Sequence, residues 1–317
     1  MKKCPYCNEK LSDNANFCHN CGEKYKIVAN LVINENKPKT PTQKELNDLA
    51  DIFEVQALPD GTFAIFEGVG KFETYEVPYF VSEIECDAFT NIRGLREVTI
   101  GDNVKVIDIN AFGDEIEVIN ITLSEEAMQS IAEQTTDGGL EEMFPYVDEL
   151  NFTISNQATI IPERIFASLD IIDIEIPDSV EIIGERAFEN CEDLESVTFG
   201  NSVRIISANA FENCYDLEDL EFPDSLEVIE EFAFAGCDNL SELNFPNSLR
   251  EIGDGAFSGC SYLETVNFGE NIESISEDAF EDCDDITYVT IKENTPLNKR
   301  DLAKIFPEDC DIERLDN

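Results

Sequence analysis

The chain has 317 residues and a formal net charge of −48 at pH 7, with 69 acidic residues against 21 lysines and arginines. A negative field of this size repels phosphate backbones, so nucleic-acid binding by the acidic part of the chain is not expected. No apolar run approaches the roughly 18 residues that a membrane span requires, and the N-terminus lacks the apolar core of a secretory signal. We therefore expect a cytoplasmic protein.

Two Cys-x-x-Cys pairs, separated by ten residues, stand near the N-terminus and supply four thiolates: Cys4, Cys7, Cys18 and Cys21. Four thiolates complete a tetrahedral shell around one zinc ion and leave no open position for a catalytic water. A segment this short cannot bury a core, so the metal would supply its folding energy. Residues 1–25 resemble the short zinc ribbons of many bacterial proteins, which implies a structural or adaptor role. A redox dithiol is the alternative for one pair.

The other cysteines bear on the compartment. The chain holds eleven cysteines, which in a secreted protein would suggest disulfides. Because four of them have metal-binding spacing and no signal precedes them, a reducing compartment is the better interpretation. His19, the one histidine, lies beside Cys18 and is interpreted as an exposed residue between two ligands.

Residues 26–52 are predicted to form a linker and a short capping helix. Pro38 and Pro41 interrupt regular structure, and Leu46, Leu49 and Phe53 then follow at helical spacing. From Phe53 to Ile65 apolar residues alternate on both sides of a Pro-Asp-Gly turn, which predicts a β-hairpin.

A repeated pattern organises residues 53–317. From Ala187 to Phe280 an Ala-Phe pair recurs every 23 residues, with a cysteine three residues after each Phe. An apolar triad such as Leu194, Val197 and Phe199 follows, in which the last two alternate as in a strand. A fixed period of this length predicts a solenoid of stacked parallel strands, each coil burying its apolar sides against its neighbours.

The repeats are regular at about 77–123 and 147–291, and helices interrupt or close them. Ser124 to about Phe144 is predicted to be helical, with Ser124 as its N-cap. A similar apolar pattern at Leu302–Pro307 is predicted to form the C-terminal cap. The fold class is therefore a mainly β solenoid with a few helices, plus a small zinc ribbon.

The repeat resembles the BspA-like, or Treponema pallidum type, class of leucine-rich repeats. The resemblance covers about residues 75–291, where five consecutive units match at every apolar position. It implies a bacterial solenoid used for protein–protein or surface recognition, with no catalytic role. Many relatives are secreted or cell-surface proteins, whereas this chain carries a zinc ribbon and no recognisable signal.

A column of cysteines recurs in the repeats, at one position per coil. Stacked thiols can in principle cross-link or bind a soft metal. We instead interpret each as a small buried apolar side chain, because Ile92 and Leu169 occupy the same position elsewhere. The column comprises Cys191, Cys214, Cys237, Cys260 and Cys283.

The outward-facing positions of the predicted strands form the candidate partner surface. These residues are acidic at one end of the array and neutral at the other, and an extended surface of this kind suits a protein partner, possibly a basic one. The alternative to a binding surface is a solvated face that keeps the chain soluble. The candidate residues are Glu195, Thr198, Glu218, Asp219, Glu221, Glu242, Asn244, Glu264, Asn267 and Tyr288.

Catalysis is not expected. No histidine lies in the repeats, no glycine-rich phosphate loop is present, and acidic runs such as 282–285 lack the pattern of a calcium loop. The sequence therefore predicts a non-enzymatic interaction scaffold with one structural zinc and no small-molecule substrate. One alternative is a surface adhesin exported without a recognisable signal. Another is a factor in which the slightly basic ribbon alone touches nucleic acid.

Overall fold

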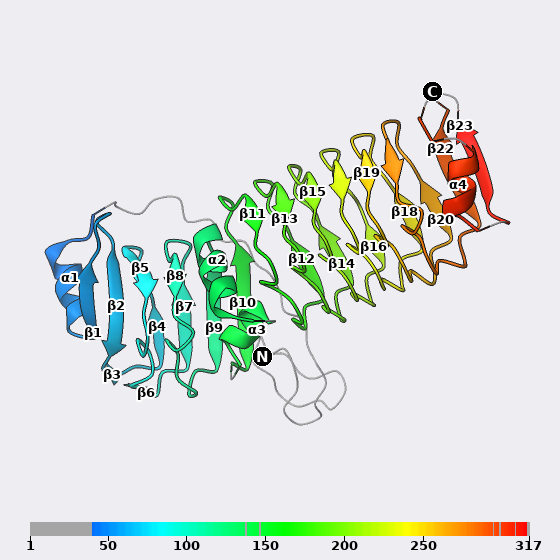
Figure 1. Cartoon of the computed structure of the whole chain (residues 1–317). Coiled ribbons are helices and arrows are strands. Elements are labelled where there is room, and N and C mark those ends of the chain that lie inside the picture. The colour runs from blue at the N-terminus through cyan, green and yellow to red at the C-terminus, as the bar shows by residue number, and fades with distance from the viewer. Residues whose placement is uncertain are drawn as a thin grey trace. The chain divides into compact units, whose positions relative to one another are not determined.

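The computed structural model describes residues 40–315, apart from residues 137, 146, 294, 298 and 308. The four predicted zinc ligands and the linker up to residue 39 lie outside the described residues. The chain divides into two compact units, which we describe separately (Figure 1). The N-terminal unit holds the chain up to Thr136 together with Glu142–Ser155, and the C-terminal unit holds Asp137–Glu141 and the chain from Asn156 onward.

A helix and a hairpin begin the described part of the N-terminal unit. Helix α1 (Gln43–Ala50) is capped by Thr42, whose side chain accepts the backbone N–H of Glu45 while Glu45 accepts that of Thr42. The helix is one turn shorter than the apolar spacing predicted, because Phe53 begins strand β1 (Phe53–Ala57). Strand β1 pairs antiparallel with β2 (Phe63–Gly68), which confirms the predicted hairpin.

Successive coils of the N-terminal unit add strands in parallel to two main sheets. One sheet has the order β1-β2-β5-β8 and the other β10-β9-β7-β4, with the short pair β3-β6 beside them. Helix α2 (Glu125–Gln134) follows β9 and packs against β8. The remaining bounds are β3 Gly70–Lys71, β4 Thr74–Glu76, β5 Val81–Ile84, β6 Ile92–Arg93, β7 Glu97–Ile100, β8 Val106–Ile107, β9 Val118–Leu123, α3 Gly139–Met143 and β10 Glu149–Ile154.

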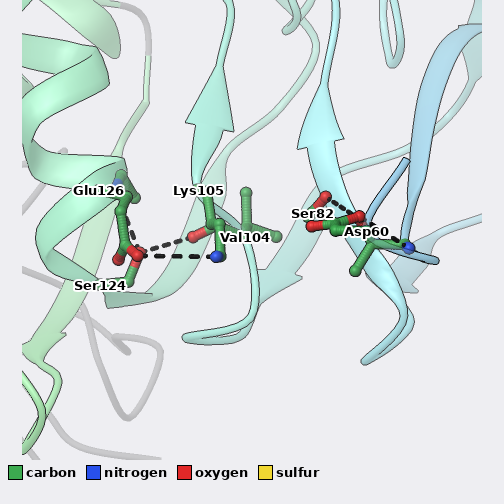
Figure 2. Close-up of polar contacts among 8 residues, drawn as sticks. Asp60, Ser82, Val104, Lys105, Ser124 and Glu126 are labelled. Atoms are coloured by element: carbon green, nitrogen blue, oxygen red, sulfur yellow. Dashed lines mark hydrogen bonds and ion pairs between the residues drawn. The ribbon is translucent and has the colours of Figure 1, made fainter. Parts of the chain in front are cut away.

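Hydroxyl groups join neighbouring coils of this unit (Figure 2). The predicted N-cap Ser124 accepts the backbone N–H of Ala127 at 3.1 Å and donates to the carbonyl of Val104 at 2.7 Å. One side chain therefore both starts α2 and satisfies a backbone acceptor of the preceding coil. Thr62 and Ser82 lie 2.6 Å apart through their hydroxyl oxygens in the first coils.

The C-terminal unit has two rows of parallel strands. The first row, β11-β13-β15-β17-β19-β21, consists of two-residue strands: Ile160–Ile161, Ile182–Ile183, Ile205–Ile206, Val228–Ile229, Glu251–Ile252 and Ser274–Ile275. The second row holds β12 Asp173–Glu175, β14 Ser196–Thr198, β16 Asp219–Leu220, β18 Glu242–Asn244, β20 Thr265–Asn267, β22 Tyr288–Lys292 and β23 Asp311–Leu315. A parallel bridge from Glu221 to Asn244 joins its two sheets.

Phenylalanine rings stack along the core of the C-terminal unit. Phe188, Phe211, Phe234 and Phe257 are fully buried, and their ring centroids lie 5.0–5.3 Å apart with interplanar angles of 3–5°. The Ala-Phe pair thus occupies the core, as its period predicts. Phe306 closes the stack at 5.2 Å from Phe280.

The C-terminal end is more elaborate than predicted. Helix α4 (Lys299–Ile305) contains the predicted cap residue Leu302, which is fully buried. The chain then returns as β23, which pairs in parallel with β22 and was not predicted. In Figure 1 both elements lie beside β22 at the red end of the chain.

Each regular coil also needs a residue with positive φ two positions after its Phe. Asn190 and Asn213 hold this position with φ of 60°, and Gly236 and Gly259 hold it with φ of 73° and 75°. Asparagine and glycine tolerate this conformation better than other residues. The backbone conformation therefore explains why asparagine or glycine stands at this repeat position.

Candidate protein-binding surface

The outward side chains of the second strand row make one continuous surface, which we call the strand face. In the three-residue strands β12, β14, β18 and β20 the middle residue is buried and its neighbours point outward: Val197 is 5% exposed between Ser196 and Thr198, and Leu243 is fully buried between Glu242 and Asn244. The strand face comprises these outward residues and those that adjoin them in the chain: Asp173, Glu175, Glu195, Ser196, Thr198, Glu218, Glu221, Ser241, Glu242, Asn244, Glu264, Thr265, Asn267, Thr287 and Tyr288. Thr290, at the corresponding position of the last coil, is buried.

The structure places the predicted surface residues together on this face. Asn267 and Tyr288 are partly buried, and Asp219 lies in β16, although its side chain is outside the described set. The remaining seven are exposed: Glu195, Thr198, Glu218, Glu221, Glu242, Asn244 and Glu264.

Amides and a hydroxyl form a hydrogen-bonded column at the neutral end of the strand face. The side-chain amide of Asn267 donates to Asn244 Oδ1 at 2.9 Å and to Glu242 Oε1 at 3.2 Å. Thr290 donates to Asn267 Oδ1 at 2.6 Å. These groups occupy one position in successive coils, so each bond crosses from one coil to the next and holds the side chains in place.

Tyr288 is fixed by a residue that was not expected on this surface. Its hydroxyl donates a hydrogen bond to a carboxylate oxygen of Glu313, in the unpredicted strand β23. This bond raises the pKa of Tyr288, because deprotonation would leave two anions in contact. The strand face therefore ends on a tyrosine held by the last strand.

The N-terminal unit repeats the amide motif on its own strand row. Asn151 in β10 donates to Asn120 in β9 at 3.0 Å, and Asn120 donates to Glu97 in β7 at 2.8 Å. Asn151 also donates to Glu149 at 2.9 Å. Here the carboxylates bind amides of the chain itself.

Basic residues of the coils between residues 160 and 291 are absent from the strand face. This stretch contains four arginines and no lysine: Arg164, Arg186, Arg204 and Arg250. Each has a carboxylate partner within 4.0 Å, the closest being Glu273 for Arg250 at 2.7 Å. The positive charge of these coils is therefore neutralised locally.

Two of these ion pairs join successive coils through the same repeat position. Arg204 contacts Glu227 at 2.9 Å, and Arg250 contacts Glu273 at 2.7 Å. The hydrogen bond from Arg204 lowers the pKa of Glu227 and raises that of Arg204. Sequence spacing contained this signal, because Arg204, Glu227, Arg250 and Glu273 are 23 residues apart.

The strand face, by contrast, keeps its negative charge. In the described part of the chain no ion pair involves the carboxylates of Glu175, Glu195, Glu218, Glu221, Glu242 or Glu264. Opposite charge from a partner would lower the repulsion among them. The negative charge of these six carboxylates therefore has no ion-pair partner among the described residues.

The cysteine column is part of the core and not of this surface. Cys237 is fully buried, and its thiol donates to the carbonyl of Phe211 at 3.2 Å; each of the other four cysteines bonds in the same way to the Phe of the preceding repeat. Burial raises the pKa of the Cys191, Cys214, Cys237 and Cys260 thiols. The apolar interpretation of these positions is confirmed.

Two absences concern the described residues alone. No group of three or more histidine, cysteine, aspartate or glutamate side chains in them has an arrangement that could hold a metal ion. None of the helices there combines the length and apolarity needed to cross a bilayer. Cys4, Cys7, Cys18 and Cys21 lie outside these residues, so their zinc site stays a prediction.

Three solved structures are among those that match the chain. A leucine-rich cell surface protein from Faecalibacterium prausnitzii A2-165 is 20% identical, with coverage of 88% of this chain and 95% of that one and a TM-score of 0.37. A leucine-rich repeat protein from Bacteroides ovatus is 17% identical, with coverage of 84% of this chain and 98% of that one and a TM-score of 0.42. The T. pallidum leucine-rich repeat protein is 22% identical, with coverage of 76% of this chain and 79% of that one and a TM-score of 0.33.

Family comparison gives a more definite result. No curated protein matches the chain. The family model described as "BspA type Leucine rich repeat region (6 copies)" matches residues 62–138 and 159–287, together more than half of the sequence. These matches coincide with the stacked coils of both units. The chain therefore belongs to the BspA-type leucine-rich repeat family.

Proposed function

We propose that this protein is a non-enzymatic interaction scaffold that binds a basic protein segment on its strand face. The observation that carries the proposal is the segregation of charge: the arginines of the coils are paired with carboxylates, whereas the strand-face glutamates have no ion-pair partner among the residues that the structure describes. Solenoids use extended surfaces of this kind to bind proteins. Electrostatic complementarity would guide the partner to this face and speed its association.

A matched pair of charge variants tests the proposal. In the first, Glu195→Gln, Glu218→Gln and Glu264→Gln remove three charges from the strand face. In the control, Glu231→Gln, Glu251→Gln and Glu270→Gln remove three equally exposed charges elsewhere. The probe is a fluorescein-labelled peptide of repeating Gly-Ser-Lys, with a Gly-Ser-Glu peptide as the negative control, and binding is measured by fluorescence anisotropy.

The two variants must differ if the site is right. We expect the strand-face variant to bind the lysine peptide about tenfold more weakly than the control variant, with a smaller dependence on salt. Equal weakening in both variants would show that only total charge matters, and the strand face would be rejected as the site.

The predicted zinc head is a second element of the proposal. Cys4, Cys7, Cys18 and Cys21 would bind one structural zinc through four thiolates, and the head would act as a docking or stabilising module. Its test is the zinc content of the purified chain, measured by elemental mass spectrometry with and without Cys4→Ser and Cys7→Ser. Equal zinc in both proteins would reject these ligands.

A surface adhesin is the alternative function, and the compartment discriminates between the two. A cytoplasmic scaffold, which we favour, would have reduced thiols and a zinc-loaded head. An exported protein would have oxidised N-terminal cysteines and no zinc. Thiol labelling of the protein immediately after lysis of its native cell, followed by mass spectrometry, distinguishes these states.

A further inference from the structure

A row of β-turns borders the strand face. In each regular coil the backbone N–H of the leucine or isoleucine that begins the apolar triad donates to the carbonyl of the cysteine three residues earlier, as between Leu217 and Cys214 at 3.2 Å. Both end residues are buried, so the two central residues of each turn lie at the surface. We call these central residues the turn row: Glu192, Asp193, Tyr215, Asp216, Asp238, Asn239, Ser261, Tyr262, Asp284 and Asp285.

Backbone hydrogen bonds fix the order of the turns. Asn239 N donates to Tyr215 O at 3.3 Å, and Tyr262 N donates to Asp238 O at 3.3 Å. Tyr215 and Tyr262 therefore lie two coils apart, roughly 10 Å at the usual strand spacing. Asp216 lies in the same turn as Tyr215, and Asp238 lies in the turn of the coil between the two tyrosines.

The two tyrosines are unusual because they are exposed without a structural role. Tyr262 is 61% exposed and Tyr215 is 39% exposed. Neither side chain takes part in a hydrogen bond or ring contact within the described ranges. Large aromatic side chains exposed in this way are typical of binding surfaces.

The surroundings of the tyrosines define the charge of a ligand. Six of the ten turn-row residues are acidic and none is basic. Asp216 accepts a hydrogen bond from Asn239 at 3.4 Å, and Asp238 accepts one from Ser261 at 3.0 Å, each through Oδ1. The second oxygen of each carboxylate stays available to a partner.

Two rings beside two carboxylates suit an arginine better than a lysine. A guanidinium group is planar, so it can stack on a tyrosine ring while it donates two hydrogen bonds to a carboxylate. An ammonium group offers neither the plane nor the paired donors. Resting on the proposed function, we infer that the turn row anchors an arginine side chain of the basic segment that binds the strand face.

The position of the turn row supports a single continuous site. Asp216 is followed two residues later by Glu218, and Tyr262 by Glu264, both on the strand face. An extended segment can therefore place one arginine on the turns and further basic residues on the strand face. The tyrosines would then set the preference for arginine, and the glutamates would supply the long-range attraction.

Two peptides that differ only in their cation test this inference. The probes are fluorescein-labelled Gly-Ser-Arg and Gly-Ser-Lys repeats of equal length, and anisotropy titrations give their Kd values for the full chain. Tyr215→Ala with Tyr262→Ala removes both rings, and Tyr215→Phe with Tyr262→Phe retains them. Phe232→Ala is the control, because Phe232 is also 39% exposed but precedes the Ala-Phe segment of its coil.

We expect the arginine peptide to bind about fivefold more tightly than the lysine peptide to the natural chain, as for stacking at an exposed ring. The double alanine variant should lose this preference, whereas the double phenylalanine and Phe232 variants should keep it. Equal binding of the two peptides to the natural chain, or an unchanged preference in the double alanine variant, would overturn the inference. Lysine-peptide binding that still depends on the strand-face glutamates would leave the proposed function standing. If neither peptide binds, both the inference about the turn row and the proposed function are wrong.

Discussion

Phe234→Ala tests the central packing feature of the C-terminal unit. The ring of Phe234 is fully buried and stacks between Phe211 at 5.1 Å and Phe257 at 5.3 Å, and Phe222 meets it edge-on at 5.8 Å. Truncation of a buried phenylalanine costs about 3–5 kcal/mol. The upper part of this range applies here, because two stacked pairs are lost and the backbone of the Phe234 coil is hydrogen-bonded to both flanking coils, which keeps them from closing the gap easily.

The measurement is urea unfolding of the full chain, followed by circular dichroism. The two units can unfold separately, so the midpoint of the transition that shifts identifies the affected unit. Phe232→Ala is the matched control, since it removes an exposed ring two residues away and should cost less than about 1 kcal/mol. A cost for Phe234→Ala no larger than that of the control would refute the assignment of the Ala-Phe position to the core.

Three further predictions concern other parts of the chain. Cys237 should resist alkylation in the native protein at pH 8, because it is fully buried and burial raises the pKa of its thiol. The exposed Cys86 should be alkylated before Cys237, and its alkylation should become faster as the pH rises. Mass spectrometry of the labelled peptides measures both rates. Asn267→Ala should lower the free energy of unfolding by about 1–2 kcal/mol, because it removes the central amide of the strand-face column; an unchanged urea midpoint would show that water replaces these bonds. Removing zinc with a chelator should leave the thermal transition of the coils in place, as should Cys4→Ser with Cys7→Ser; loss of that transition would contradict the independence of the head.

Most of the fold could be predicted because the residues that are buried recur at a fixed period in the sequence. A buried residue in one coil contacts the same position in the next, so an unsuitable side chain disturbs two neighbours. The positions of Phe188, Phe211 and Phe234 therefore stand out by period alone. Ile92 and Leu169 identify the cysteine position as apolar, and both are buried, at 3% and 7% exposure.

The ends of the array were harder to predict. A terminal coil lacks one neighbour, so its sequence does not follow the repeat. Phe53 has helical spacing with Leu49, yet it starts β1 because the hairpin needs it against Phe89, at 5.5 Å. Strand β23 has charged Asp311, Glu313 and Arg314, and nothing in this pattern reveals its pairing with β22.

The candidate site was predicted in outline only. Alternation places Glu242 and Asn244 on the outside of a strand, and both are exposed on either side of the buried Leu243, whereas Glu195 is exposed just before β14 begins. The bond from Thr290 to Asn267 depends on side-chain rotamers, which the period does not specify. The exposed Tyr215 and Tyr262 were not predicted as surface binding residues. Their signal in the sequence is that they replace acidic residues at the turns.

Comparing one repeat position across coils separates structural charge from charge that is available to a partner. Where opposite charges alternate along a position, as at Arg204 and Glu227, the coils neutralise each other and gain little affinity for anything else. Where one sign persists, as at Glu195 and Glu218, the stacked coils repel each other at that position. The core stabilises the coils in spite of this repulsion, and a cationic partner would relieve it. The unpaired acidic positions therefore indicate where binding energy is available, and they lie on the strand face and the turns that border it.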